Sequence, residues 1–439
     1  MDQGSVKIFT TRQVPRLDFI AGIIFGNILG LGYELVTDKR KIGKSPVINY
    51  SDEELKGSFR IIPHELLFET GIREQDISVT EWNGHPVFFE TGNHADFPFD
   101  IFAASFYLVS RYEEYLPHKA DEHGRFPGAA SLAARNGFLM KPVVDTWAHE
   151  LARAIIKKFP TLAFRKNTFS SLVTIDVDQP FEYLGKDVLR NIGGLFRDFS
   201  RKDGKASERY RIVTKGEKDP WDVFDFITGS INEHTADARF FFPMGDKSKY
   251  DRNPSWQNED YRKLIRKLSS AFDFGLHPSY SSGSESGLLK TELKRLRSLT
   301  TNDINSSRFH YLLLNFPDSY RYLLASGIVN DFSLGFHDLP GFRAGIARPF
   351  RFFDLVSDHL TDLVLTPFQF MDATLYQYMK LDCNEAGKIV NDLISETARV
   401  GGNFVSIWHN TSLLDLDEWQ CWRSLFVEML KKCRNDNIS

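Results

Sequence analysis

Carboxylate, imidazole and guanidinium side chains recur where short apolar segments end, from about residue 170 of this 439-residue chain onward. The segment SLVTIDVDQP delivers Asp176 and Asp178, and ionised carboxylates are costly to bury unless a partner compensates them. Later apolar segments end at His277, His310, Arg343, Asp372 and His409. Carboxylates and imidazoles can hold a metal ion and transfer protons, so this set of residue types indicates hydrolytic or acid–base chemistry.

Such residues need elements that bring their ends together. From Ser170 onward, helical stretches alternate with apolar strands, which read SLVTID, ARFFFPM, FDFGLH, FHYLLLNF, VNDFSLGF, LVLTPFQFM and NFVSIWHN. This alternation over about 270 residues predicts a parallel sheet, and its length suits an irregular (β/α) barrel of about seven parallel strands. Because chemistry in such barrels gathers at the carboxyl ends of the strands, we expect the residues above to converge on one mouth.

Each of these residues also has a purely structural interpretation. Asp372 could be the N-cap of a helix that begins at ATLYQYM. Arg343, in the glycine-flanked GFRAG, could anchor a loop through carbonyl groups, and His337 fits a loop residue. A single histidine at a strand end is more often structural than catalytic, so the prediction depends on the joint placement of the set.

The first 165 residues mix short apolar runs with helical segments, without the regular alternation seen later, and predict a smaller α+β domain. Helical periodicity indicates helices in DIFAASFYLVSRYEEYL and PVVDTWAHELARAIIKKF. We therefore expect an accessory module over 1–165 and a catalytic domain over 166–439. The apolar stretch 19–35 contains four glycines, an asparagine and a glutamate, which favours a buried segment over a transmembrane helix.

Composition restricts the partners and the compartment. The net charge of −4 gives no electrostatic case for a nucleic-acid partner. The N-terminus lacks a signal peptide pattern, and the three cysteines predict neither a disulfide framework nor a zinc ribbon. We therefore expect a cytoplasmic protein. A segment rich in lysine and arginine around 186–218 is interpreted as a solvated insertion, with a docking surface for an anionic glycan or lipid as the alternative.

Four segments in order, TIDVDQP, GLHPSYSS, GFRAGIARPF and VSIWHN, resemble the motifs of the polysaccharide deacetylases with a NodB-homology domain. The resemblance extends from about Thr168 to the C-terminus. FDIFAASFYLVSRYEEYLP and GFLMKPVVDTW resemble the module that precedes this domain in a group of bacterial deacetylase-like proteins.

The resemblance implies a metal-dependent hydrolase that removes an N-acetyl or O-acetyl group from a sugar or polysaccharide. Asp178, His277 and His310 would hold a divalent metal, for which zinc is the best candidate. Asp176 would be the general base, although the two aspartates could exchange roles. Arg343 would orient this base, while His409, supported by Asp372, would protonate the departing amine. The side chains expected to stack on the sugar are Tyr280, Phe342 and Trp408, and core packing is their alternative role.

Two departures from the family pattern leave alternatives open. A valine separates Asp176 from Asp178, whereas the family has adjacent aspartates. Ser281 stands where the family has a second histidine, so His310 is the candidate replacement. Without a replacement, the chain would be a catalytically weak or inactive protein that binds a glycan or a partner. A non-sugar amide or an ester remains an alternative substrate. The family's frequent action on envelope glycans keeps envelope association open, and the sequence leaves the oligomeric state undetermined.

Overall fold

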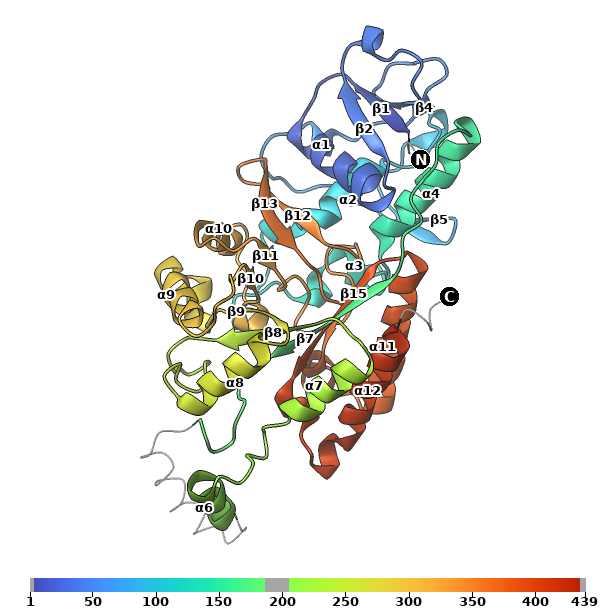
Figure 1. The fold of residues 1–439 in the computed structure, drawn as a ribbon. Helices are drawn as coiled ribbons and strands as arrows, with labels where there is room; N and C mark the ends of the chain where they lie inside the picture. The colour runs from blue at the N-terminus through green and yellow to red at the C-terminus, as the bar shows by residue number, and fades with distance from the viewer. Residues whose placement is uncertain (1–3, 186–204, 435–439) are drawn as a thin grey trace.

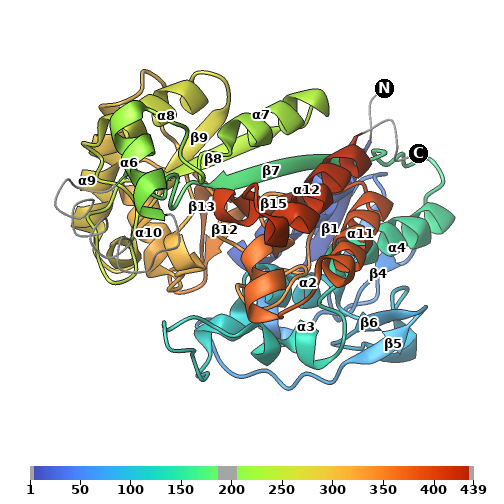
Figure 2. The same ribbon diagram turned by 90° about the horizontal axis from the view of Figure 1, so that it is seen from below.

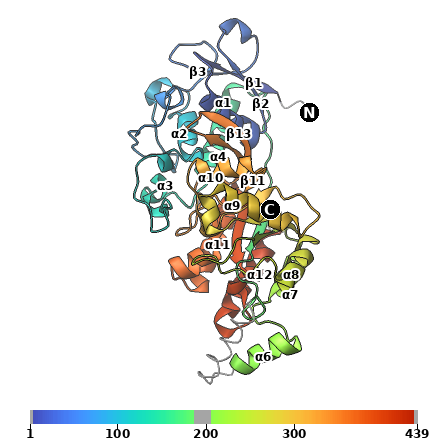
Figure 3. The same cartoon turned by 90° about the vertical axis from the view of Figure 1, so that its left-hand side faces the viewer.

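The computed structural model describes residues 4–185 and 205–434. It is a mixed α/β structure with a large, mainly parallel sheet and a smaller four-stranded sheet (Figure 1). The small sheet and the helix α6 (Lys205–Lys215) lie at opposite ends of the molecule, as Figures 1 and 3 show. Most of the insertion expected around 186–218 lies outside the described residues.

The large sheet contains nine strands in the order β12-β13-β11-β10-β9-β8-β7-β15-β14. Their bounds are β7 Ser170–Asp176, β8 Ala238–Pro243, β9 Asp273–His277, β10 Ser306–Ser307, β11 Asn330–Asp331, β12 Phe350–Asp354, β13 His359–Leu365, β14 Phe370–Met371 and β15 Asn403–His409. Every pair in this order is parallel except β12 with β13. The carboxyl ends of the parallel strands therefore point to one edge.

The two flanks of this sheet are connected by one extended stretch of chain. β13 pairs with β11, β14 pairs with β15, and only residues 366–369 separate β13 from β14. Since an extended chain advances at most about 3.6 Å per residue, this short link draws the flanks together and the sheet must be rolled. The sequence predicts about seven parallel strands. The described residues contain eight, because the predicted strand LVLTPFQFM is divided between β13 and β14.

Helices between successive strands cover the outside of this sheet. They are α7 Phe224–Glu233, α8 Glu259–Ser269, α9 Ser286–Arg297, α10 Asp318–Ala325, α11 Cys383–Arg399 and α12 Gln420–Cys433. Their starts are encoded locally: Asn258 accepts a hydrogen bond from the Tyr261 amide, and Asp382 and Glu385 form a capping box. Figure 2 shows α7 and α12 beside β7 and β15.

Two predicted strands are much shorter than expected. In FHYLLLNF, no residue belongs to a strand: β10 ends at Ser307, and His310–Leu312 form a 3₁₀ turn. Tyr311 and Leu312 adopt left-handed backbone conformations with φ of 60° and 53°, which a strand cannot accommodate. In VNDFSLGF, pairing is limited to Asn330–Asp331. After β10 the chain turns toward the pocket described below, which Phe309 to Leu312 help to line.

The N-terminal part contains a parallel sheet in the order β2-β1-β3-β4, together with a short hairpin of β5 and β6. The strands are β1 Ser5–Thr10, β2 Gly32–Val36, β3 Val47–Tyr50, β4 Phe59–Arg60, β5 Thr80–Trp82 and β6 His85–Val87. The helices are α1 Pro15–Ala21, η1 Gly22–Ile28, α2 Ile101–Val109, α3 Leu132–Arg135 and α4 Val143–Lys158. α2 ends earlier than predicted because Arg111 takes a left-handed conformation with φ of 56°.

The apolar stretch 19–35 is divided among α1, the π-helix η1 and β2, and its phenylalanines and isoleucines are buried. Within the described ranges, no helix is both long and apolar enough to cross a bilayer.

Two of the three cysteines form a disulfide that their spacing did not predict. Cys383, in the first turn of α11, pairs with Cys421, in the first turn of α12, with Cα atoms 6.1 Å apart. The pairing arises because α11 and α12 pack together, a tertiary contact that has no signature in sequence spacing. Cys433 is free and buried.

Buried ion pairs join the N-terminal part to the large sheet. The Nε of Arg343 lies 2.9 Å from Glu114 Oε1, and the Nε of Arg111 lies 2.7 Å from the same oxygen. Arg343 also donates to the carbonyl of Gly335 at 2.8 Å. The expected placement of Arg343 beside Asp176 is thus corrected: its guanidinium is committed to a structural carboxylate on another part of the chain.

We expect Arg343→Met to lower the free energy of unfolding by about 3 kcal/mol, because the Glu114 carboxylate would stay buried with only Arg111 to compensate it. Chemical denaturation of the full chain measures this loss. Arg40→Met is the matched control: Arg40 pairs with Asp38, its side chain is 91% exposed, and its removal should leave the midpoint unchanged. Equal midpoints for the two variants would contradict a structural role for Arg343.

Candidate metal centre

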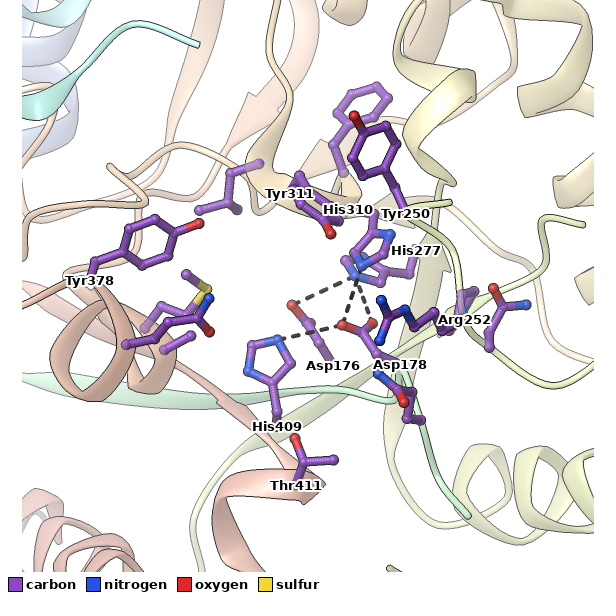
Figure 4. Close-up of a pocket in the computed structure, with 18 of the residues that line it drawn as sticks. Asp176, Asp178, Tyr250, Arg252, His277, His310, Tyr311, Tyr378, His409 and Thr411 are labelled. Atoms are coloured by element: carbon purple, nitrogen blue, oxygen red, sulfur yellow. Dashed lines mark ion pairs between the residues drawn. The ribbon is translucent and has the colours of Figure 1, made fainter. Parts of the chain in front are cut away.

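Asp176, the last residue of β7, and Asp178, two residues beyond it, face the same pocket. In the sheet register, Asp176 is level with His409 on β15 and with Phe241 on β8. The amide of Val177 donates to the carbonyl of Phe241 at 3.0 Å, so the parallel ladder extends past the end of β7. Residues two apart on a strand share a face, and both carboxylates therefore point into the same pocket (Figure 4). The intervening valine does not separate them.

Asp178, His277 and His310 form a cluster whose potential ligand atoms all lie within 4.8 Å of one another. His277 Nε2 lies 3.1 Å from Asp178 Oδ1, and His310 Nε2 lies 3.4 Å from Asp178 Oδ2. His277 Nε2 and Asp178 Oδ1 are buried and have no hydrogen-bond partner. One carboxylate oxygen and two imidazole nitrogens, of which two atoms have no other polar partner, suit a divalent cation.

Hydrogen bonds at the far side of each imidazole fix its orientation. His277 Nδ1 lies 2.6 Å from the carbonyl oxygen of Arg308, which can only accept, so this nitrogen carries the proton. His310 Nδ1 lies 2.9 Å from Asp251 Oδ1. In both rings Nε2 is therefore the nitrogen that faces the pocket. Hydrogen bonds to the other ring nitrogen orient metal-binding histidines in the same way.

Charges around the cluster change its proton affinities. Burial raises the pKa of Asp178, but His310 and His277 outweigh it and hold this pKa well below the usual value. Burial lowers the pKa of His310, and the carboxylates of Asp178 and Asp251 reverse that effect and raise it to about 9. The carboxylate is thus kept ionised, as a metal ligand must be.

Arg308 is the cation that compensates Asp176. Its Nη1 lies 2.8 Å from Asp176 Oδ1, and neither side chain is more than 4% exposed. Arg308 also donates from Nε to the carbonyl of Phe332 at 3.1 Å and lies over the ring of Phe241. Asp176 Oδ2, by contrast, faces the cluster, 4.0 Å from His277 Nε2.

His409 and Asp372 form a second oriented pair at the pocket. His409 Nδ1 lies 2.7 Å from Asp372 Oδ1, and the His409 amide donates to Asp372 Oδ2 at 2.7 Å. His409 Nε2 faces the cluster, 3.7 Å from Asp178 Oδ2. Burial lowers the pKa of His409, but Asp372, Asp178 and Asp176 raise it to about 10. Asp372 also accepts from the amide of Ala373 at 2.6 Å, but the π-helix that follows, Thr374–Tyr378, has no side-chain cap, so the alternative role of Asp372 as a helix N-cap is not supported.

The pocket has a volume of about 360 Å³ and a polar, tyrosine-rich lining. Its lining residues include Tyr250, Tyr311, Tyr376, Tyr378, Arg125, Arg252 and Asn253. Two of the three aromatic residues expected to stack on a sugar lie in the core instead, because Phe342 and Trp408 are 1% and 0% exposed. Tyr280 stacks on Tyr250 with ring centroids 4.1 Å apart and supports the wall from behind. Ser281 is not among the lining residues.

Several site residues carried no recognisable signal in the sequence. Asp251 and Arg252 come from the polar loop after β8, several residues beyond the end of the strand, so no nearby apolar run points to them. Arg308 lies two residues before His310 and directly before the predicted strand FHYLLLNF. A shorter strand ending near Ser307 would have indicated that Arg308 and His310 both reach the carboxyl edge.

A loop of the N-terminal part completes the pocket. Arg125 pairs with Asp121 at 2.8 Å and donates from Nη1 to the carbonyl of Tyr311 at 2.7 Å. His123 Nδ1 lies 3.2 Å from the Tyr280 hydroxyl. The N-terminal part therefore contributes directly to the wall beside His310.

Comparisons with known proteins identify only distant similarities. A family model described as a family of unknown function (DUF7033) matches residues 6–160. No curated protein matches the chain. Among solved structures, a candidate polysaccharide deacetylase from Mycobacterium smegmatis is 15% identical, with 62% of this chain and 86% of that protein covered and a TM-score of 0.41. Agd3, described as a carbohydrate deacetylase, is 8% identical, with 98% of this chain and 84% of that protein covered and a TM-score of 0.36.

A 4-alpha-glucanotransferase from Thermococcus litoralis is 12% identical, with 61% of this chain and 37% of that protein covered and a TM-score of 0.33. At these identities and TM-scores, nothing about the activity of this chain follows from the likenesses. Its chemistry has to be inferred from the geometry of its own pocket.

We expect His277→Ala and His310→Ala to lower zinc occupancy to a similar extent, because each removes one of the three clustered ligand atoms. His409→Ala should retain the metal, since its imidazole lies outside the cluster of closest atoms. Elemental analysis of purified, zinc-supplied protein after dialysis compares the variants. Wild-type occupancy in His310→Ala would show that His310 is not a ligand.

Proposed function

We propose that this chain is a metal-dependent hydrolase that removes an acetyl group, from nitrogen or oxygen, of a sugar or polysaccharide. The observation that carries the proposal is the cluster of Asp178, His277 and His310, in which His277 Nε2 and Asp178 Oδ1 are buried, face each other at 3.1 Å and have no other polar partner. Beside the cluster lie Asp176, whose carboxylate pairs with Arg308, and His409, whose imidazole Nδ1 is hydrogen-bonded to Asp372. The motif resemblance in the sequence supports the same reaction.

Asp178, His277 and His310 would hold the divalent ion, and zinc suits one oxygen and two nitrogen ligands. When bound, such an ion polarises a carbonyl group and lowers the pKa of water toward about 7. The fit rests on the two unsatisfied atoms and on the outer hydrogen bonds to Arg308 and Asp251, which leave both Nε2 atoms facing the cluster.

Asp176 is the proposed general base. Its Oδ1 accepts a hydrogen bond from Arg308 Nη1 at 2.8 Å, which fixes the orientation of the carboxylate. Its Oδ2 faces the cluster and is available to accept the proton of an attacking water. Arg308 thus performs the role that the sequence assigned to Arg343.

His409 is the proposed general acid. Its Nδ1 proton is held by Asp372, and its Nε2 points toward the cluster, so a proton on Nε2 is positioned for a departing amine. The Asp372 carboxylate favours the imidazolium form through its charge. The acid and the base then lie on different strands, β15 and β7, at the same level of the sheet.

The lining of the pocket supports a sugar as the substrate. Tyrosine combines an apolar face with a polar hydroxyl, which matches the mixed surface of a sugar ring. Tyr250, Tyr311 and Tyr378 surround the cluster in Figure 4, and arginine, glutamine and asparagine side chains provide hydrogen-bonding groups between them.

Metal content and acetate release test the proposal together. We expect close to one divalent ion per chain, retained through washing, and release of acetate from N- or O-acetylated sugars that stops when a chelator removes the ion. No retained metal, even after zinc is supplied, would instead support a binding protein without hydrolytic activity.

We expect His409→Gln to lower kcat by about 10²–10⁴-fold while metal content stays at the wild-type level, because it removes the proton donor and no ligand. Asp372→Asn should lower kcat less, since it weakens the orientation of His409 without removing it. Steady-state acetate release and elemental analysis measure the two effects. The matched control is His359→Gln, an exposed histidine at the start of β13, which should retain wild-type kcat. Loss of metal in His409→Gln would contradict the assignment.

A further inference from the structure

Arg252 is a cation of the pocket wall that has no counter-ion among the residues that the structure describes. Its side chain is exposed, lines the pocket and points toward Asp178 in Figure 4. Among residues 4–185 and 205–434, no carboxylate lies within ion-pair distance of its guanidinium and no hydrogen bond engages it.

The backbone on both sides of Arg252 is fixed. Asp251, 2% exposed, accepts hydrogen bonds from the Tyr280 amide at 3.0 Å and from the hydroxyl of Ser248 at 2.7 Å, and it also holds His310. Asn253, 3% exposed, donates from Nδ2 to the carbonyls of Gly245 and Pro254, each at 3.0 Å. Arg252 therefore extends from a rigid base, and its charge is positioned in the pocket.

The other charges of the pocket already have partners. Arg125 pairs with Asp121, and Asp176 pairs with Arg308. The acidic residues in the lining are Asp176 and Asp178, and the second of these belongs to the metal cluster. A bound divalent ion would neutralise Asp178 further, so the charge of Arg252 would face a pocket that contains no free carboxylate.

We propose that the pocket binds a sugar that carries an anionic group, either a carboxylate or a sulfate or phosphate ester, and that Arg252 binds this group. This inference rests on the proposed function only in taking the ligand to be an acetylated sugar. A guanidinium matches the planar, two-oxygen geometry of carboxylate and of phosphate and sulfate oxygens.

The tyrosines next to Arg252 give this binding a direction. Tyr250 lies two residues before Arg252, and its ring meets that of Tyr311 at 5.7 Å and 74°. Figure 4 shows Tyr250 on the same side of the cluster as Arg252, whereas Tyr378 lies on the opposite side. The anionic substituent would thus lie toward the loop after β8, and the sugar ring would extend across the cluster toward Tyr378.

Equilibrium binding tests the proposal without requiring turnover. The zinc-loaded full chain carrying His409→Gln is titrated calorimetrically with N-acetylglucosamine, its 6-sulfate, its 6-phosphate, and N-acetylmuramic acid, which carries a carboxylate. The same titrations are made after adding Arg252→Gln or, as a matched loss of charge outside the pocket lining, Lys249→Gln. Because the readout is affinity, a protein that binds but releases no acetate would fail the proposed function and still test this inference.

We expect at least one anionic sugar to bind about 10-fold or more tightly than N-acetylglucosamine, as a charge-assisted hydrogen bond provides. Arg252→Gln should abolish that preference, and Lys249→Gln should keep it. The proposal is overturned if no anionic probe is preferred, or if the preference survives in Arg252→Gln. The probe that shows the preference distinguishes a carboxylate from a sulfate or phosphate.

Discussion

Two carboxylates at the end of one buried strand have to be compensated, and much of the pocket is arranged around that constraint. β7 brings Asp176 and Asp178 to the carboxyl edge on the same face. A buried carboxylate without a partner costs several kcal/mol, so each needs its own cation or proton. Asp176 receives the guanidinium of Arg308 at 2.8 Å, and Asp178 is surrounded by His277, His310 and His409 at 3.1–3.7 Å. The two carboxylates thus acquire different environments and can perform different chemistry.

One short segment supplies partners to both carboxylates. Arg308 and His310 are separated by a single residue, and they reach Asp176 and Asp178 because the chain leaves the sheet after Ser307. Tyr311 and Leu312 then adopt left-handed conformations, which are unfavourable for residues with a side chain and need support from their surroundings. Arg125 provides part of that support through the carbonyl of Tyr311. The N-terminal part is therefore tied to the geometry of the cluster.

The sequence predicted the pocket residues that end apolar runs and missed those that no such run marks. Asp176, His277, Asp372 and His409 come at the ends of apolar runs, and the register of β7, β8, β9 and β15 brings their ends level. The partner of Asp176 could not be identified, because Arg308 follows a polar stretch rather than an apolar run, and only tertiary distance shows that Arg308 and not Arg343 reaches Asp176. Periodicity likewise cannot separate a core aromatic such as Trp408 from one that faces a pocket. The loop that carries Asp251 and Arg252 has neither periodicity nor a strand end to mark it.

The tautomers of the histidines link the cluster to pH. His277 Nδ1 must donate to the carbonyl of Arg308, so its Nε2 bears either a lone pair or a second proton. A lone pair that faced Asp178 Oδ1 at 3.1 Å with nothing between them would be repulsive, and a proton or a cation must therefore lie between these two atoms. The same reasoning applies to His310, whose Nδ1 is held by Asp251. Protons and a metal ion consequently compete for one set of atoms, and metal affinity must fall as the pH decreases and the imidazoles become protonated.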